Sequence, residues 1–278
     1  MTIALLNQYK TYFLIADVHL NKNKPALSHN LIKILNEIST VPESCLIILG
    51  DLVDFWFENK LYDTASEYPI LNKIGNLLGK TGYPVYLIKG NRDFICGQRF
   101  ESVAGIKILG DEAIIDSAGR KYYLTHGDIF CTRDISYLIW RKLSRSFIMK
   151  YCTLLIPKQL ALFLIRRLRL FSSLKKIRDK AINLSIVIKQ VEQKAVLTGA
   201  NAVICGHNHI FRIRPLKTST HSDKCQRDNF YIQENPNNSN SNIINHINPQ
   251  ASNPNSISRT KLIVLHKMHK WGTYCLKI

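Results

Sequence analysis

The feature that most constrains the fold is the stretch Cys45–Asp54, which reads CLIILGDLVD. Its aliphatic run, residues 46–49, ends abruptly at Gly50 and Asp51. A short run of this kind predicts a strand of a parallel sheet that is buried on both faces. Gly50 permits a sharp turn that lets the Asp51 carboxylate approach another group closely. Open α/β sheets bind ligands at this carboxyl edge, although a strand that ends in Gly-Asp is also a common structural feature.

Four other predicted strands also end in polar side chains. These strands and the side chains that follow them are Tyr12–Ala16 with Asp17 and His19, Pro84–Ile88 with Asn91 and Arg92, Lys121–Thr125 with His126, and Ala202–Cys205 with His207 and His209. In an extended segment, two residues that are separated by one position project to the same side. We therefore expect each pair, 17 with 19 and 207 with 209, to reach one point.

Helical patterns alternate with these strands and indicate an α/β protein. The remaining predicted elements are a helix over Ser28–Ile38 with Ser28 as its cap, a helix over Thr64–Leu78 ended by Gly79 and Gly82, short strands at Lys107–Leu109 and Ala113–Asp116, and two closing strands, Lys261–His266 and Thr273–Ile278, that pair as a hairpin around Trp271 and Gly272. With 278 residues and 46% hydrophobic composition, the chain can bury one main core with a smaller appended element.

Charge and cysteine content limit the partners and the compartment. The net charge of +18 favours an anionic partner, which can be phosphate groups, nucleic acid or an acidic membrane surface. The seven cysteines are scattered without CxxC pairs, which is typical of reduced, buried cysteines in a cytosolic protein. The start of the chain lacks the features of a signal peptide, and no uncharged apolar run reaches the length of a membrane span.

Two segments differ from the rest of the chain. Residues 132–196 hold 15 Lys and Arg against three acidic residues, and their pattern is helical. A basic, aliphatic stretch such as Lys150–Phe171 fits a membrane surface or an acyl chain, and it fits a solvated helix with a buried stripe equally well. Residues 217–261 are rich in Asn and Ser and poor in large apolar residues, which predicts a disordered loop.

The strand-end side chains form one set of candidate metal ligands, namely Asp17, His19, Asp51, Asn91, His126, His207 and His209. They offer oxygen and nitrogen without thiolate, and such a set suits Mn²⁺, Fe²⁺ or Zn²⁺ better than Mg²⁺. The set is large enough for two cations if Asp51 is shared between them. Two neighbouring cations can activate a water and stabilise the attacking and leaving oxygens, which predicts hydrolysis of a phosphate ester or anhydride.

The motifs D-x-H, G-D-x-x-D, G-N-x-x, H-G-D and G-H-x-H, in this order, resemble those of the calcineurin-like metallophosphoesterase superfamily. The resemblance implies a sandwich of two mixed β-sheets flanked by helices. It also implies two metal sites that share Asp51, one formed by Asp17, His19, Asp51 and His209, and the other by Asp51, Asn91, His126 and His207.

Arg92 stands where many members of that superfamily carry a histidine that protonates the leaving group. A phosphate leaving group does not need that proton donor, because its second pKa is about 6. An arginine also neutralises the charge of such a group. Arg92 therefore indicates a diphosphate substrate that is cleaved between its phosphates.

Residues 90–94 (GNRDF), residues 126–134 (HGDIFCTRD) and the helical insertion that follows resemble the UDP-2,3-diacylglucosamine diphosphatase family of lipid A biosynthesis. The similarity extends over roughly residues 12–212. It implies attack on the α-phosphate of UDP-2,3-diacylglucosamine, release of UMP and 2,3-diacylglucosamine 1-phosphate, and two Mn²⁺ ions. It further implies a monomer without a nucleic-acid partner, bound peripherally at the cytoplasmic side of the inner membrane.

The same resemblance assigns roles to segments and residues. Residues 1–131 and 197–278 form the metallophosphoesterase core, and 132–196 form a helical cap that holds the acyl chains. The catalytic residues are Asp51, Arg92 and His126, the substrate-binding residues are Asn91, Arg92, Asp134, Ser173, Lys180 and His207, and Tyr137 and Trp140 lie near the rim. Residues 210–211 and 265–272 depart from the family pattern without touching a candidate metal ligand.

Three alternatives stay open on the sequence. A nuclease, a nucleotide-sugar diphosphatase or another metal-dependent phosphodiesterase fits the positive charge, although that charge is concentrated in helices rich in Leu, Ile and Phe rather than along a polar groove. A scaffold that has lost catalysis would lack a ligand, whereas all seven positions are filled. A membrane-binding module with a structural metal would use cysteines or four closed ligands, which does not fit this set.

Overall fold

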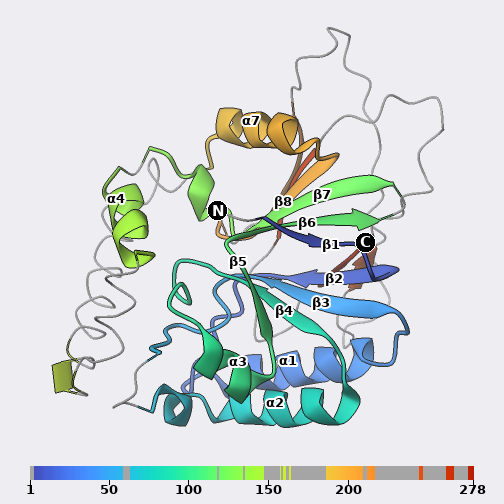
Figure 1. Cartoon of the computed structure of the whole chain (residues 1–278). Coiled ribbons are helices and arrows are strands. Elements are labelled where there is room, and N and C mark those ends of the chain that lie inside the picture. The colour runs from blue at the N-terminus through green and yellow to red at the C-terminus, as the bar shows by residue number, and fades with distance from the viewer. Residues whose placement is uncertain are drawn as a thin grey trace, which may run out of the picture.

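Two six-stranded sheets pack face to face in the computed structural model of the protein, and helices cover their outer faces (Figure 1). The structure describes residues 3–58, 63–117, 119–133, 135–146, 157, 159–160, 163, 186–208, 212–216, 244–246, 261–265 and 275–278. Each sheet combines parallel and antiparallel pairs of strands. The predicted α/β sandwich of two mixed sheets flanked by helices is confirmed.

The lower sheet in Figure 1, here called sheet B, provides three of the five predicted strand ends. From edge to edge it consists of β10 (Ile244–His246), β12 (Cys275–Lys277), β2 (Thr11–Ile15), β3 (Ser44–Leu49), β4 (Val85–Ile88) and β5 (Lys107–Gly110). The strands β2, β3 and β4 run parallel, so their carboxyl ends lie along the same edge of the sheet.

The upper sheet, here called sheet A, provides the other two strand ends. From edge to edge it consists of β1 (Ala4–Leu6), β6 (Glu112–Ser117), β7 (Arg120–Thr125), β8 (Ala202–Cys205), β11 (Lys261–Val264) and β9 (Arg212–Pro215). Because β7 and β8 are parallel neighbours, the loops that follow them also leave the sheet at a common edge.

The central strand β3 is buried along its whole length. Leu46 and Ile48 pack with the helices on the outer face of sheet B, whereas Ile47 and Leu49 pack between the two sheets. Successive side chains of a strand point to opposite faces, so a strand covered on both sides needs an unbroken apolar run. The prediction of a buried parallel strand from residues 46–49 is therefore confirmed.

Helices cover both sheets from outside (Figure 1). The described helices are α1 (Pro25–Ile38), α2 (Pro69–Thr81) and α3 (Gln98–Ala104) on sheet B, α7 (Ile188–Thr198) on sheet A, α4 (Ile135–Ser144) at the side of the sandwich, and the short 3-10 helices η1 (Thr64–Glu67) and η2 (Asp128–Phe130). No helix in the described parts of the chain is long and apolar enough to cross a bilayer.

The boundaries of two predicted helices are wrong. α1 begins at Pro25, so Ser28 lies inside the helix instead of capping it. Proline suits a first helical position because its φ is fixed and its missing N–H would have no partner there. α2 starts only after η1, and it continues through Gly79 to Thr81. Gly82 ends α2 in a left-handed conformation with φ of 64°, as predicted.

The predicted closing hairpin is also wrong. β11 pairs with β8 and β9 in sheet A, whereas β12 pairs with β2 and β10 in sheet B. The chain end is fixed to sheet B because Ile278 and Tyr12 exchange two backbone hydrogen bonds of 3.0 and 3.1 Å. Ile244–His246, inside the segment predicted to be a disordered loop, forms β10. The rest of that segment up to residue 260 lies outside the described residues.

Part of the predicted cap packs on the core. α7 begins inside the range 132–196 and ends two residues beyond it, and its buried Val191 and Ala195 pack with Tyr123 and Val203 of sheet A. The division of the chain into core and cap stays a prediction. The buried, free cysteines that the sequence predicts are found at Cys45, Cys96, Cys131 and Cys205, the ones whose side chains are described.

A stability measurement tests the packing of α3 on the loop after β3. The rings of Phe100 and Trp56 are fully buried and meet edge to face with centroids 5.2 Å apart. We expect Phe100→Ala to lower the free energy of unfolding by about 3–5 kcal/mol, because it removes this contact and leaves a cavity. Urea denaturation measures the change. Leu5→Ala, at a side chain that is 64% exposed, is the control, and an equally small effect of both changes would contradict the described packing.

Candidate active site

Five loops at the carboxyl ends of strands carry the predicted site residues. Asp17 and His19 follow β2, Asp51 follows β3, Asn91 and Arg92 follow β4, His126 follows β7, and His207 follows β8. The described members of this set lie close together, in two groups that meet at Asp51. His209 lies outside the described residues, so its position stays a prediction.

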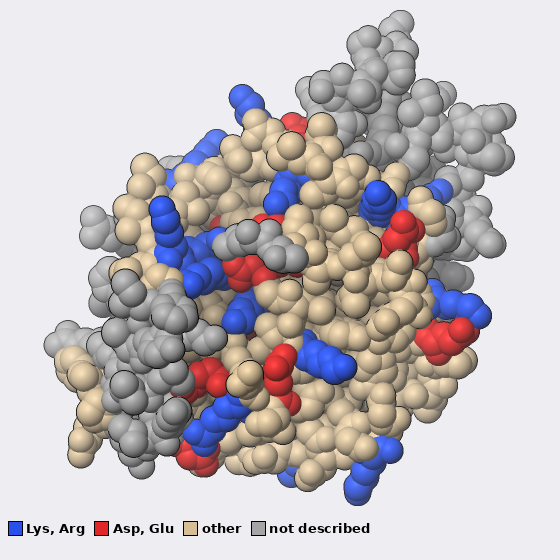
Figure 2. All heavy atoms as spheres, in the orientation of Figure 1, with Lys and Arg blue, Asp and Glu red and all other residues tan. Residues whose placement is uncertain are grey.

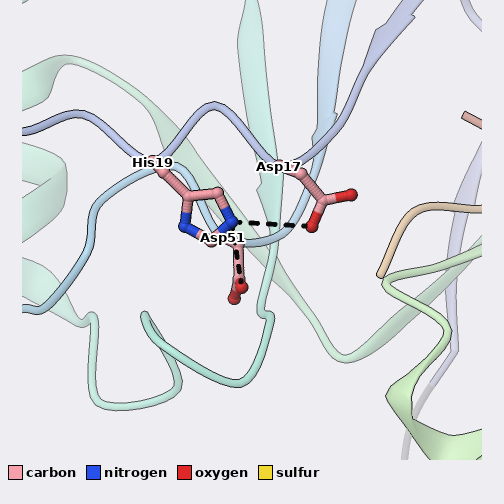
Figure 3. Close-up of side chains that lie close together, drawn as sticks. All are labelled: Asp17, His19 and Asp51. Carbon is pink, nitrogen blue, oxygen red and sulfur yellow. Dashed lines mark ion pairs between the residues drawn. The ribbon is translucent and has the colours of Figure 1, made fainter. Parts of the chain in front are cut away.

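The first group consists of Asp17, His19 and Asp51, whose side chains converge from two loops (Figure 3). Nε2 of His19 lies 4.0 Å from Oδ1 of Asp17 and 3.8 Å from Oδ2 of Asp51. All three side chains are buried. Ligand atoms that surround one divalent cation at about 2.0–2.2 Å are about 3–4.4 Å apart. The group therefore fits a cation held between its members.

A further carboxylate orients the His19 ring. Oδ1 of Asp54 lies 3.4 Å from Nδ1 of His19, and Oδ2 of Asp54 accepts a hydrogen bond of 2.6 Å from Asn21. Burial raises the pKa of Asp54, but the hydrogen bonds from His19 and Asn21 outweigh it and lower the pKa to about 2. A metal-binding histidine usually donates its other ring N–H to a carboxylate, which orients the ring so that the free nitrogen faces the metal.

The second group lies at the other oxygen of Asp51. Oδ1 of Asp51 is 3.7 Å from Nε2 of His126, and that nitrogen is 3.1 Å from Nδ1 of His207. The side-chain amide of Asn91 lies 3.5 Å from the same nitrogen of His207. Asp51 thus has one histidine beside each carboxylate oxygen, which is the arrangement expected of a ligand shared between two cations.

The His126 ring is held with Nε2 toward the site. Nδ1 lies 2.9 Å from the carbonyl oxygen of Leu49, which can only accept, so Nδ1 carries the proton. Burial alone would lower the pKa of His126, but the carboxylates of Asp51, Asp17 and Asp128 raise it to about 9. These carboxylates therefore favour positive charge beside Nε2, whether a proton or a metal cation supplies it.

Four of the site residues have a left-handed backbone. φ is 53° at Asp17, 51° at His19, 54° at Asp51 and 70° at His207, and Glu43 is the one other non-glycine residue with positive φ in the described ranges. Such conformations cost roughly 1–3 kcal/mol each and are concentrated at functional sites. The prediction that residues 17 and 19, or 207, lie in an extended segment is therefore wrong, because their backbone is left-handed, although the side chains of Asp17 and His19 do reach one point as predicted.

Two glycines let the loops after β3 and β4 touch. Gly50 has φ of 78°, and a Cβ at this position would lie 2.7 Å from Cα of Gly90 and 2.6 Å from Nδ1 of His126. A Cβ at Gly90 would overlap Oδ1 of Asp51. The predicted role of Gly50 in a sharp turn is confirmed, and the missing side chain of Gly90 lets the opposite loop approach Asp51.

Arg92 and Asp93 connect the same two loops. The backbone N–H of Arg92 donates to Oδ1 of Asp51 over 3.0 Å, and its Nε lies 3.7 Å from Oδ2. Asp93 accepts hydrogen bonds from the N–H groups of Gly90 and Leu52 over 2.6 and 2.8 Å. Burial and the charge of Asp51 raise the pKa of Asp93 to about 6. Asp93 was not among the predicted site residues, although its place in GNRD identifies it.

Asp128, in the motif H-G-D, is a second buried acid that was not among the predicted site residues. Its carboxylate accepts hydrogen bonds from the hydroxyl group of Tyr137 and, over 2.9 Å, from Nε of Arg141. Burial raises the pKa of Asp128, but the charges of His126 and Arg141 outweigh it and hold the pKa below its usual range. Tyr137, predicted near the substrate rim, therefore joins α4 to the core.

The remaining predicted substrate residues are not described in the structure. These are Asp134, Ser173, Lys180 and the side chain of Trp140. Their roles stay predictions.

The fold and the two groups of candidate ligands at strand ends point to one class of protein. The family model for calcineurin-like phosphoesterases matches residues 11–211 of this chain. The matched range contains all seven predicted ligands. The chain belongs to the calcineurin-like phosphoesterase family.

Known relatives of this chain share one name within that family. The UDP-2,3-diacylglucosamine hydrolase of Vibrio cholerae serotype O1 is 32% identical over 210 residues, 73% of this chain and 83% of that protein. Proteins of the same name from Histophilus somni and Neisseria meningitidis serogroup B are 34% and 32% identical, over 72% of this chain and 84% and 82% of their own. The resemblance to this group of hydrolases is thereby confirmed. Among solved structures, a dimetal phosphatase from Danio rerio aligns with 94% of this chain and 88% of its own, at 13% identity and a TM-score of 0.44.

A metal-binding measurement tests the support of His19. We expect Asp54→Asn to weaken the binding of Mn²⁺ about 10- to 100-fold, because a neutral amide replaces the negatively charged acceptor beside Nδ1 of His19. Isothermal titration of the intact protein with Mn²⁺ measures the change. Asp63→Asn is the matched control, since this carboxylate is 57% exposed and pairs with Arg99 at the surface. Identical affinities in the two variants would contradict the role of Asp54.

Proposed function

We propose that the protein hydrolyses the diphosphate bond of UDP-2,3-diacylglucosamine and releases UMP and 2,3-diacylglucosamine 1-phosphate. The observation that carries this proposal is the identity of 32–34% to hydrolases of that name over 72–73% of this chain. The chain also covers 82–84% of the length of those relatives, so the similarity extends beyond the ligand motifs.

The donor set supports two Mn²⁺ ions. In this proposal one ion is held by Asp17, His19, Asp51 and His209, and the other by Asp51, Asn91, His126 and His207. Carboxylate, amide and imidazole groups without thiolate suit Mn²⁺. The two described groups face different oxygens of Asp51, which supports a shared ligand. When bound, the ions supply an activated water and neutralise charge on the reacting phosphate.

Three side chains of the chain itself prepare the site for this reaction. Asp51 fixes the two ligand groups relative to each other, because its oxygens lie 3.8 and 3.7 Å from the two histidine nitrogens. His126 keeps Nε2 directed inward, since the Leu49 carbonyl holds the proton on Nδ1. The guanidinium group of Arg92 lies beside Asp51 on a side chain that is 24% exposed, so it can bind a phosphate that enters from solvent.

The identity of Arg92 supports a diphosphate substrate. Its guanidinium group stays charged and can donate two hydrogen bonds to one phosphate. Such a group neutralises a departing phosphate, and this leaving group does not require a proton donor at neutral pH. In this proposal Arg92 and Asn91 contact the diphosphate, and Asp134, Ser173, Lys180 and His207 complete the substrate site.

The helical segment 132–196 is the lipid-binding cap in this proposal. On α4, the side chains of Ile135, Ile139 and Leu143 are 69%, 65% and 50% exposed. Residues spaced by four positions share one face of a helix, so these three form an apolar stripe. The opposite face contacts the core through Arg141. The stripe supports contact of α4 with acyl chains or lipid.

We further propose that the protein is a monomer that binds peripherally to the cytoplasmic leaflet of the inner membrane. The segment 132–196 has a net charge of +12, and an apolar stripe beside basic residues suits an anionic bilayer surface. The acyl chains of the proposed substrate would remain close to that surface during the reaction.

An assay of UMP release tests the proposed reaction. We expect UMP from UDP-2,3-diacylglucosamine in the presence of Mn²⁺, and none with Asp51→Ala, because both ligand groups lose their shared carboxylate. Arg92→Ala should lower kcat/KM at least about 100-fold, a typical loss for a group that stabilises the reacting charge. Chromatography of the released nucleotide measures all three proteins.

Arg99→Ala is the matched control for this assay, because Arg99 pairs with Asp63 at the surface and should retain the native rate. UMP release that persists in Asp51→Ala would contradict the shared ligand. Cleavage of DNA or of a simple phosphodiester without any UMP release would contradict the lipid substrate and show that the protein is a nuclease or another phosphodiesterase.

A binding experiment tests the membrane-facing stripe. We expect Ile139→Asp to weaken binding to vesicles that contain anionic phospholipid, because it places a negative charge in the apolar stripe. Co-sedimentation with vesicles measures the bound fraction. Leu197→Asp is the control, since Leu197 is 82% exposed on α7, away from α4. Equal binding of the two variants would show that α4 does not face the lipid.

A further inference from the structure

Four charged side chains join α4 to the core. Arg141 on α4 and Arg145, one turn later, pair with Asp111, between β5 and β6, and with Asp128, after β7. The exposed fractions of these side chains are 14%, 11%, 13% and 1%, respectively. Figure 2 shows Lys and Arg side chains beside Asp and Glu on the α4 side of the molecule. We refer to Arg141, Arg145, Asp111 and Asp128 as the clasp.

The two arginines of the clasp differ in one contact. Nε of Arg145 lies 3.0 Å from Oδ2 of Asp111, and its Nη2 donates a hydrogen bond of 3.2 Å to the carbonyl oxygen of Gly90. Arg141 binds the same two carboxylates, at 3.3 Å from Asp111 and 2.9 Å from Asp128. Among the described contacts, Arg145 bonds to the Gly90 carbonyl and Arg141 does not. The two residues therefore form a matched pair for experiment.

Gly90 begins the loop that carries Asn91 and Arg92. Within the loop, Gly90 N–H donates to Asp93 over 2.6 Å, and the rest of the core is joined to it by Lys89 N–H to the Gly110 carbonyl, Arg92 N–H to Asp51 and Leu52 N–H to Asp93, over 2.7, 3.0 and 2.8 Å. From the α4 side, Arg145 donates to the Gly90 carbonyl. This carbonyl belongs to the peptide bond before Asn91, so its orientation affects where the Asn91 side chain points.

We propose that Arg145 is a positioning residue that fixes the Asn91–Arg92 loop and makes the second ligand group depend on the docking of α4. The proposal deepens the proposed function and rests on it for its kinetic consequence, whereas its consequence for metal binding stands on the geometry alone. A guanidinium group is required, because its planar fork binds the Asp111 carboxylate and the Gly90 carbonyl at the same time. A lysine retains the charge and lacks that fork.

The test compares Arg145→Lys with Arg141→Lys in the intact protein. Both variants lose part of the clasp, so both should lower the melting temperature by a similar amount. Arg145→Lys should also weaken the binding of one Mn²⁺ about tenfold and lower kcat for UMP release about tenfold, with little change in KM, as expected when the support of a metal ligand is lost. Arg141→Lys should leave metal affinity and kcat at their native values. Isothermal titration and single-substrate kinetics measure these quantities.

Two results overturn the proposal: equal metal affinity and kcat in both lysine variants, or native metal affinity in Arg145→Lys. If the native protein releases no UMP, the proposed function fails, and the Mn²⁺ titrations still decide the role of Arg145. Should Arg145→Lys not fold, Asp111→Asn is the second variant, because it removes the charge that holds Nε of Arg145. It should weaken the binding of one Mn²⁺, and native affinity in this variant also overturns the proposal.

Discussion

The site depends on the buried carboxylate of Asp51, which is 2% exposed and has a cationic or potentially cationic group beside each oxygen. Burial alone would raise the pKa of Asp51, but His126, His19 and Arg92 hold it below its ordinary value. A buried carboxylate stays ionised only with such partners. The same charge, between two groups of candidate ligands, is what the two metal ions of the proposed site require. Asp51 therefore connects the stability of the site with the proposed chemistry.

The sandwich brings Asp51 to its partners by the direction of its strands. Parallel strands in each sheet send five loops to a common edge, where backbone hydrogen bonds connect loops that are far apart in sequence. The N–H groups of Asp17 and His19 donate to the carbonyls of Gly50 and Asp51 over 3.2 and 2.8 Å. Such bonds, together with the packed sheets, offset the strain of the left-handed residues. Arg145, which directly follows α4, adds its contact to the Gly90 carbonyl from outside the sandwich.

The five strands that precede the candidate site could be predicted from sequence, because an unbroken apolar run such as 46–49 permits few structures, whereas the short strands β1, β9 and β10 were missed. The conformation of Asp17 could not, since alternation of side chains assumes an extended backbone and Asp17 has a left-handed φ of 53°. The closing strands were assigned correctly as strands and wrongly as partners, because a short apolar pattern does not specify which distant edge it completes. The contacts of Asp93 and Arg145 could not be predicted either, because their partners are brought close only by the tertiary structure.

The most direct measurement is the electron paramagnetic resonance spectrum of the native protein titrated with Mn²⁺. We predict that each chain binds two Mn²⁺ ions and that the spectrum of the loaded protein shows magnetic coupling between neighbouring ions. Asp51→Asn should lose this coupling, because the shared carboxylate is replaced by an amide. A single bound ion, or two ions whose spectra are those of isolated Mn²⁺ in the native protein, would contradict a metal pair shared by Asp51.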